Sequence, residues 1–247
     1  MRVSKLERYR QLSSFPNILE PSVKTLLNAP FELSGKWNDS FFRRSGKLIL
    51  EMGCGWGDFS LGLARRFSER NILGLDVKGG RVWRGAKTAL EEGLTNIGFI
   101  RIEGEVLEKL FAPGELSEIW ITFPTPYLMK PEKMLLSPTY LSKYRKLLSP
   151  DGVLHVKTDV ESLVSYVHNI WPLCGFQILG LNDLPGECRQ IPECGRDDMQ
   201  TRFEARAIER EKPIRSVDAV RIPGEVSPIP AEILRCPWSL GKTGTSP

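Results

Sequence analysis

The stretch Leu48-Ile49-Leu50-Glu51-Met52-Gly53-Cys54-Gly55-Trp56-Gly57-Asp58-Phe59 decides the fold. An apolar run that ends in an acid is typical of a buried strand, and three glycines follow it at alternate positions. Apolar residues with helical spacing begin at Phe59. Because glycine has no Cβ, such a turn can adopt positive φ, and its backbone can lie against a bound molecule. The stretch therefore predicts a strand, a ligand-binding turn and a helix N-terminus.

Two kinds of ligand compete for a turn of this type. Dinucleotide sites use the spacing G-x-G-x-x-G, whereas this turn reads G-x-G-x-G and Glu51 ends its strand. A carboxylate at that point would repel a diphosphate, but it suits the sulfonium and ammonium groups of S-adenosylmethionine. A second acid, Asp76, ends the next apolar run, where it could accept hydrogen bonds from both ribose hydroxyls. The two acids favour S-adenosylmethionine.

Apolar runs and helical patterns alternate from residue 48 onward. Strands are expected at 48–51, 72–76, 96–102, 119–123, 153–158 and 176–181, with helices between them and a strong turn at Pro150-Asp151-Gly152. Strands that are apolar throughout and separated by helices predict an α/β, doubly wound, mostly parallel sheet. Ligands bind at the carboxyl ends of such strands, where Glu51, Asp76, Glu103, Thr125 and Asp159 fall.

Composition and charge suggest how the chain is divided. With 247 residues and 41% apolar content, the chain can form a single large core, expected at 47–222. Residues 1–46 read as a basic arm whose aromatic end packs on that core, and the proline-rich segment 223–247 is expected to be disordered. Residues 1–47 hold nine bases and four acids, whereas the whole chain has a net charge of +4, so the arm could bind phosphates.

The sequence also limits location, oxidation state and metal binding. It has no apolar run of membrane-spanning length and no signal-peptide core at its start, so a cytoplasmic protein with no membrane contact is expected. Five cysteines, without a Cys-x-x-Cys pair, predict reduced thiols and no metal site. A monomer or homodimer is expected, and nothing indicates an obligate protein partner.

Several segments together, in this order along the chain, resemble the bacterial tRNA (guanine-N7)-methyltransferase family. They are Gly35-Lys36-Trp37-Asn38, the Glu51 glycine turn, Gly74-Leu75-Asp76, Ile102-Glu103-Gly104-Glu105, Phe123-Pro124-Thr125-Pro126, Leu154-His155-Val156-Lys157-Thr158-Asp159 and Thr201-Arg202-Phe203-Glu204. The glycine turn alone marks only a class I methyltransferase. The later segments are more specific, and the resemblance implies that 47–222 is a methyltransferase domain.

The resemblance implies a fold, a reaction and a set of site residues. The fold would be a seven-stranded sheet whose last strand, 214–222, is an antiparallel edge. The reaction would be methyl transfer from S-adenosylmethionine to N7 of a guanine in tRNA. The cofactor would be bound by Glu51, Gly53, Gly55, Asp76, Glu103, Gly104 and Thr125. The guanine would be bound by Lys130, Asp159, Thr201 and Glu204, and the catalytic residues would be Asp159, Glu204 and Thr125.

One segment departs from the family pattern. The family typically has Phe-Pro-Asp-Pro-Trp and then a dense basic run, but here Thr125 occupies the position of the aspartate. Of the basic run only Lys130 and Lys133 remain. Because threonine offers a hydrogen bond but no charge, the departure predicts a slower enzyme and a different grip on RNA.

Other interpretations of these segments remain open. Thr201-x-x-Glu204 is also the pattern of a helix capping box, and His155 inside an apolar strand reads as a core residue. The chain could be a tRNA-binding protein of the same fold with weak or lost catalysis. It could also be an exocyclic-amine methyltransferase, although Pro124-Thr125-Pro126-Tyr127 lacks the Asp or Asn and the two adjacent prolines that such sites usually have.

Overall fold

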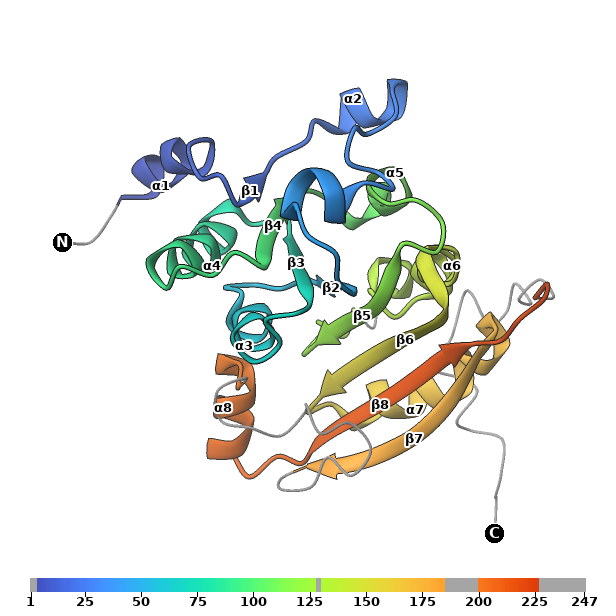
Figure 1. Ribbon diagram of the computed structural model, residues 1–247. Coiled ribbons are helices and arrows are strands. Elements are labelled where there is room, and N and C mark those ends of the chain that lie inside the picture. Colours follow the sequence, from blue (N-terminus) through green and yellow to red (C-terminus); the bar gives the residue numbers. More distant parts are fainter. Residues whose placement is uncertain (1–3, 128–129, 185–199, 227–247) are drawn as a thin grey trace, which may run out of the picture.

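The apolar runs of the sequence form the strands of one sheet. The computed structural model describes residues 4–127, 130–184 and 200–226, and in this part the strands form one sheet in the order β1-β4-β3-β2-β5-β6-β8-β7 (Figure 1). The strands are β1 (Ile18–Leu19), β2 (Leu48–Met52), β3 (Asn71–Asp76), β4 (Ile97–Arg101), β5 (Leu116–Thr122), β6 (Leu148–Thr158), β7 (Phe176–Leu184) and β8 (Ile214–Arg221). The predicted α/β sheet is confirmed.

All strand pairs from β1 to β6 are parallel, and β8 is antiparallel to both β6 and β7. The antiparallel strand expected at 214–222 is therefore present as β8. It does not form the edge, because β7 lies outside it. At the other edge, the two residues of β1 pair with β4 and add an eighth strand to the expected seven.

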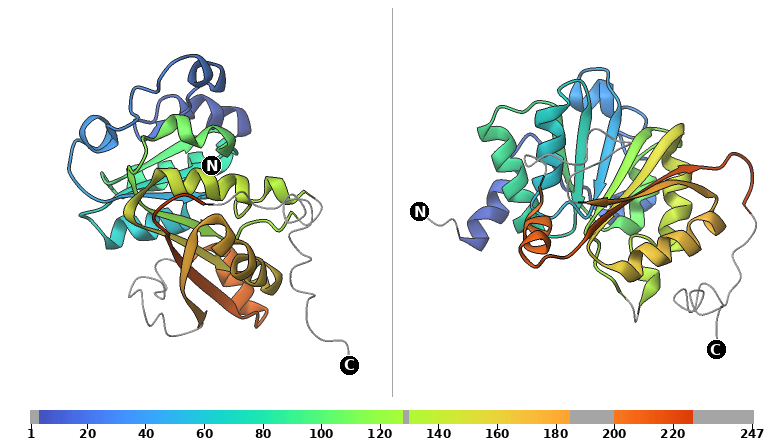
Figure 2. Two further views of the ribbon diagram at one scale, coloured as in Figure 1. Left: turned by 90° about the vertical axis from the view of Figure 1, so that its right-hand side faces the viewer. Right: turned by 90° about the horizontal axis from the view of Figure 1, so that it is seen from below.

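Helices cover both faces of the sheet (Figures 1 and 2). One apolar cluster holds α1 (Lys5–Leu12), α3 (Asp58–Arg66) and α4 (Gly79–Glu91) against Ile49 and Phe99. The other holds α2 (Val23–Asn28), α5 (Leu107–Leu110), α6 (Pro138–Leu147) and α7 (Glu161–Ile170) against Leu48 and Leu50. Successive side chains of a strand point to opposite faces, so β2, which is buried along its whole length, supplies both clusters.

The segment before β2 is folded rather than a simple arm. It contains α1, β1, α2 and a π-helical turn, η1 (Trp37–Phe42). Trp37 is completely buried, its indole N–H donates to the Leu110 carbonyl at 3.0 Å, and its ring stacks on Phe111. Asn38 accepts a bond from Asn71 and donates to the Gly46 carbonyl. The Gly-Lys-Trp-Asn motif thus fixes this segment to the start of β2 and β3.

The turn predicted before the fifth strand has a different place in the structure. Pro150-Asp151-Gly152 does not separate a helix from a strand, because β6 already begins at Leu148. Instead it forms an irregularity, since between Leu116 and Glu118 of β5 the partner residue moves from Leu148 to Val153. Residues 185–199, and residues 227–247 of the expected disordered tail, lie outside the described residues.

Buried polar side chains also lie in the sheet. His155 is 2% exposed, its Nδ1 lies 2.8 Å from Asp218 Oδ1, and its ring stacks on Trp120 at 3.9 Å. The interpretation of His155 as a core residue is confirmed. Among the helices of the described ranges, none has both the length and the apolar character that crossing a membrane requires.

Candidate active site

The glycine turn between β2 and α3 has the conformation that its sequence predicts. Gly53, Gly55 and Gly57 have φ values of 71°, 58° and 76°, in the left-handed region that favours glycine. A Cβ on Gly57 would lie 2.8 Å from the Phe99 ring and 3.2 Å from Gly85 Cα. Gly57 therefore lets α3 approach α4 and β4 closely, while Gly53 and Gly55 turn the backbone at the carboxyl end of β2.

Glu51 is the penultimate residue of β2, just before this turn, and is 1% exposed. Its Oε2 accepts the Ser60 N–H at 3.0 Å and the Ser60 hydroxyl at 2.5 Å, and its Oε1 accepts the Thr122 hydroxyl at 2.7 Å. Burial raises the pKa of Glu51 to about 7, although the hydrogen bonds from Ser60 and Thr122 oppose that rise. Glu51 thus links β2, α3 and β5 through hydrogen bonds, and these bonds fix the strand just before the glycine turn.

Asp76 ends the neighbouring strand, β3, and is 7% exposed. Its Oδ2 accepts the Gly55 N–H at 3.0 Å, and its Oδ1 accepts the Lys78 N–H at 2.8 Å. The second strand-end acid therefore contacts the glycine turn directly. The carboxyl ends of the parallel strands therefore bring together three residues that are separated in sequence, Glu51, Gly55 and Asp76, as expected.

A hollow of about 380 Å³ opens beside Asp76 at the ends of β3 and β4. It is lined by residues at or just after the ends of these two strands, Val77, Arg101, Ile102 and Glu103, and by Glu20, Pro21 and Val23 from the N-terminal segment. Arg101 and Glu20 form an ion pair at 2.6 Å across it. The wall from residues 20–23 was not expected, because only the pairing of β1 with β4 brings that segment here.

Gly104 follows Glu103 and lies in a tight place. A Cβ there would lie 3.0 Å from the Tyr140 ring and 3.1 Å from Met52 Cε. Gly104 is buried, whereas Glu103 is exposed at the mouth of the hollow. Gly104 therefore lets the chain after β4 approach β2, and Glu103 keeps its carboxylate free to face a ligand.

The loop after β5 begins with an unusual backbone. Phe123 has φ 48°, rare for a residue with a Cβ, and its N–H donates to the Lys157 carbonyl at 2.7 Å. This bend carries Thr125 to an exposed position. Strained residues of this kind gather at functional sites. Further along, Lys130 is exposed at the start of η3 (Pro131–Lys133).

The apolar residues that replace the basic run pack into the protein. Met134 is 1% exposed and Leu136 is completely buried. Leu135 packs against the larger apolar cluster, and a Cβ on Gly53 would lie 3.2 Å from its Cδ1. These residues anchor the loop over the glycine turn, so the lost positive charge has a structural cause.

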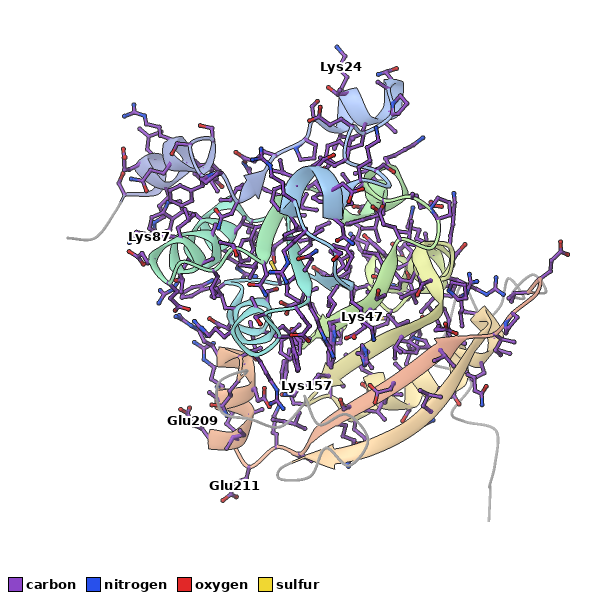
Figure 3. All side chains as sticks on the ribbon, in the orientation of Figure 1. Lys24, Lys47, Lys87, Lys157, Glu209 and Glu211 are labelled. Atoms are coloured by element: carbon purple, nitrogen blue, oxygen red, sulfur yellow. The ribbon has the colours of Figure 1, made fainter. Side chains whose placement is uncertain are left out.

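Lys157, which Figure 3 labels near the end of β6, forms a buried ion pair with Glu204. Their side chains are 3% and 11% exposed, and Lys157 Nζ lies 2.6 Å from Glu204 Oε1. Glu204 belongs to α8 (Arg202–Glu209), and its backbone N–H donates to the Thr201 hydroxyl at 3.0 Å. Thr201 thus caps α8, as the capping-box interpretation expected. The Glu204 side chain does not complete the box, because it points to Lys157.

Asp159 lies just past the end of β6 and is partly exposed. Lys212 Nζ, from the segment between α8 and β8, lies 3.3 Å from Asp159 Oδ2. The predicted guanine site is thus built on two elements that meet, the end of β6 and α8. Lys157 lies within one of the family motifs, but the sequence indicated no role for it, because its partner Glu204 lies far along the chain.

The residues at this edge fit S-adenosylmethionine. The left-handed glycines expose backbone at the end of β2, Asp76 stands where ribose hydroxyls could reach it, and Val77 and Ile102 give the hollow apolar walls. Among the described residues no group of His, Cys, Asp and Glu has the arrangement of a metal site, and Cys54 and Cys174 are buried free thiols. Cys188, Cys194 and Cys236 lie outside the described ranges.

Solved structures share this fold. The chain superimposes on a structure described as an antibiotic-related methyltransferase with a TM-score of 0.60, 16% identity, and coverage of 78% of this chain and 97% of the other. For the 16S rRNA methyltransferase KamB the TM-score is 0.56 at 16% identity, with 90% and 96% covered. The mostly parallel sheet, the glycine turn and the strand-end acids define a class I methyltransferase.

Sequence comparison narrows this class. The model of the family described as "Putative methyltransferase" matches residues 45–215. A tRNA (guanine-N(7)-)-methyltransferase from Christiangramia forsetii is 39% identical over 213 residues, which cover 85% of this chain and 95% of the relative. One from Bacteroides thetaiotaomicron is 40% identical over 166 residues, 67% of this chain and 66% of the relative. The chain belongs to the tRNA (guanine-N(7)-)-methyltransferase family.

Proposed function

We propose that this protein transfers the methyl group of S-adenosylmethionine to N7 of a guanine in tRNA, in the cytoplasm. The main support for the proposal is that two sites lie together at the carboxyl ends of the parallel strands. The glycine turn with Asp76 forms a nucleoside cradle, and the Lys157–Glu204 pair stands at the end of β6 on the same edge. Relatives that are 39% to 40% identical to this chain over the aligned residues carry the name of that activity.

The acceptor atom decides what the protein has to supply. Guanine N7 is a bare hydrogen-bond acceptor with an in-plane lone pair, so no general base is needed before attack. S-adenosylmethionine supplies an electrophilic methyl group on a positively charged sulfur. The residues of the chain have to hold N7 in line with that methyl group and exclude water, and most of the rate then comes from positioning.

Glu204 is the residue best placed to bind the guanine. Lys157 holds one carboxylate oxygen, while Oε2 is buried and has no hydrogen-bond partner among the residues that the structure describes. Such an atom is unfavourable unless a ligand supplies a donor. The N1–H and N2–H groups of guanine are such donors. Once bound, Glu204 would also stabilise the positive charge that develops on the purine ring.

Asp159 and Thr125 complete the proposed site. Asp159 places a second carboxylate at the end of β6, and Lys212 holds it there. Thr125 stands on the bent loop after Phe123, where it can donate or accept one hydrogen bond. Because it brings no charge to the cationic cofactor, we expect catalysis weaker than with the family aspartate at this position.

The direct test is methyl transfer to defined RNA. Purified protein would be incubated with unmodified tRNA transcripts and S-adenosylmethionine, and the nucleosides would be identified by mass spectrometry. N7-methylguanosine is the expected product. A methylated exocyclic amine would replace this proposal with the alternative enzyme, and tight tRNA binding without any product would identify a binding protein that has lost catalysis.

A further inference from the structure

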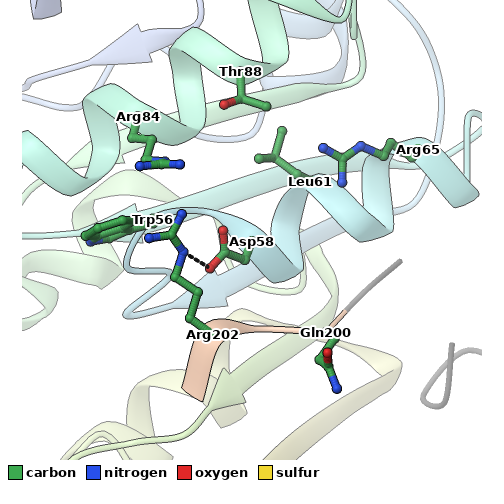
Figure 4. Close-up of a pocket in the computed structure, with 8 residues that line it drawn as sticks. All are labelled: Trp56, Asp58, Leu61, Arg65, Arg84, Thr88, Gln200 and Arg202. Carbon is green, nitrogen blue, oxygen red and sulfur yellow. Dashed lines mark ion pairs between the residues drawn. The ribbon is translucent and has the colours of Figure 1, made fainter. Parts of the chain in front are cut away.

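A polar hollow of about 200 Å³ lies beside the proposed active site, where α3, α4 and α8 meet (Figure 4). Trp56, the residue between the second and third glycines of the turn, lines this hollow and is 37% exposed. The Arg202 guanidinium lies 3.8 Å from the Trp56 ring centroid, and that of Arg84 lies 4.8 Å from it. In Figure 4 Arg84 reaches the indole from α4 above and Arg202 from α8 below.

These two arginines are incompletely neutralised. Within the described residues, Arg84 has no carboxylate partner in an ion pair. Arg202 Nε lies 3.5 Å from Asp58 Oδ2, longer than the 2.7–2.9 Å typical of a charge-assisted hydrogen bond. By contrast, Arg65 at the rim is bound by both oxygens of Glu92 at 2.7 Å. The hollow therefore carries excess positive charge from Arg84 and Arg202.

Local geometry favours an anion here. Guanidinium groups that stack on an indole keep their N–H donors at the ring edge, ready to bind two phosphate oxygens at once. Asp58 and Arg202 are the first residues of α3 and α8, so both helices turn their N-terminal ends toward the hollow. Thr88 and Gln200 add neutral polar groups to its lining.

We propose that Trp56, Arg84 and Arg202 form a docking site for a backbone phosphate of the RNA substrate. The proposal rests on the proposed tRNA methylation and adds a contact to it. Arg202 directly follows Thr201, and Trp56 lies within the cofactor turn, so the bound phosphate belongs to a nucleotide near the target guanosine. This contact compensates in part for the thinned basic run of the loop after β5.

The test compares tRNA binding by charge-removing variants. Arg84→Gln and Arg202→Gln keep much of the side chain over Trp56, and Lys109→Gln is the matched control because Lys109 is exposed on α5, which packs on the opposite face of the sheet. Each arginine variant is expected to bind tRNA roughly tenfold more weakly. Each should also reduce the slope of log affinity against log salt by about 1. Lys109→Gln should leave both unchanged.

The outcomes separate this inference from the proposed function. Calorimetry with S-adenosylmethionine and the thermal midpoint show whether each variant is folded, and both are expected to match wild type. Wild-type affinity and salt slope in the two arginine variants, while the unmodified protein makes N7-methylguanosine, would overturn the docking site and leave the function intact. If wild-type protein neither binds nor methylates tRNA, the function itself fails and takes this inference with it.

Discussion

Lys157 Nζ lies 2.6 Å from Glu204 Oε1. Within the described residues, this ion pair is the shortest contact between charged side chains of β6 and α8. Both side chains are largely buried, and one oxygen of Glu204 has no hydrogen-bond partner in the described part of the chain. A buried pair of this kind contributes little net stability, because desolvation opposes the attraction. We infer that the pair is retained because it positions Glu204.

Breaking this pair should destabilise the protein strongly. Lys157→Met leaves the Glu204 carboxylate buried without its cation, and we expect the free energy of unfolding to fall by about 3 to 5 kcal/mol. Denaturant unfolding at pH 7 measures this. The double variant Lys157→Met with Glu204→Gln should recover much of the loss while methyl transfer stays low. If the double variant were as unstable as the sum of the two single variants, the pair would not be coupled.

Glu51 predicts an unusual pH dependence of stability. Its pKa is about 7 in the folded protein, against 4.5 for the unperturbed group. Between these values the folded state binds a proton that the unfolded state has lost, so stability contributed by this group is present below pH 4.5 and falls as pH rises toward 7. The loss amounts to about 3 kcal/mol at 1.36 kcal/mol per pKa unit.

Glu51→Gln removes this titration. Unfolding free energies of both proteins at pH 5, 6, 7 and 8 provide the measurement, and the difference between variant and wild type should shift in favour of the variant as pH rises to 7. A difference that stays constant over this range would mean that the Glu51 carboxyl is already ionised at pH 5.

Much of the sheet could be predicted, because apolar runs bounded by turns define β2, β3 and β5 locally. Other features depend on partners far along the chain. The two residues of β1 form a strand only because β4 lies beside them. The alternation in 214–222 identifies a strand but not its neighbours, so its place between β6 and β7 was missed. The convergence of Glu51 and Asp76 at the carboxyl ends of their strands followed from parallel pairing, whereas the Lys157–Glu204 contact required the three-dimensional structure.

Gly57 should tolerate no side chain. Gly57→Ala places a Cβ at 2.8 Å from the Phe99 ring on a backbone with φ 76°, and we expect a loss of about 2 to 5 kcal/mol in unfolding free energy. Gly80→Ala is the control, because among the described residues no atom outside its chain neighbours and its own helix backbone lies within 4 Å of the added Cβ, and helices favour alanine. Thermal denaturation should show a lower midpoint for the first variant only. Equal midpoints would show that Phe99 moves aside.

The N-terminal segment should behave as part of the core, an expectation that substitutions in α1 can check. Leu12 is 1% exposed and packs in the cluster of α3 and α4, while Gln11 accepts a bond from the Trp83 indole at 2.9 Å. Leu12→Ala is expected to reduce the unfolding free energy by about 2 to 5 kcal/mol. Leu6→Ala on the same helix, at a side chain 64% exposed, should change it by less than about 0.5 kcal/mol. Similar values for both would indicate a detached arm.

Thr125→Asp should make the enzyme faster. Thr125 is exposed on the loop that Phe123 bends toward the cofactor edge, so a carboxylate there can interact with a cationic methyl donor without a burial penalty. One added charge-assisted contact is worth about 1.5 to 3 kcal/mol, or roughly ten- to a hundredfold in kcat/KM. Thr95→Asp is the control, because Thr95 is exposed just before β4, at the amino ends of the parallel strands. Turnover of Thr125→Asp at or below that of wild type would show that threonine is the better residue in this loop.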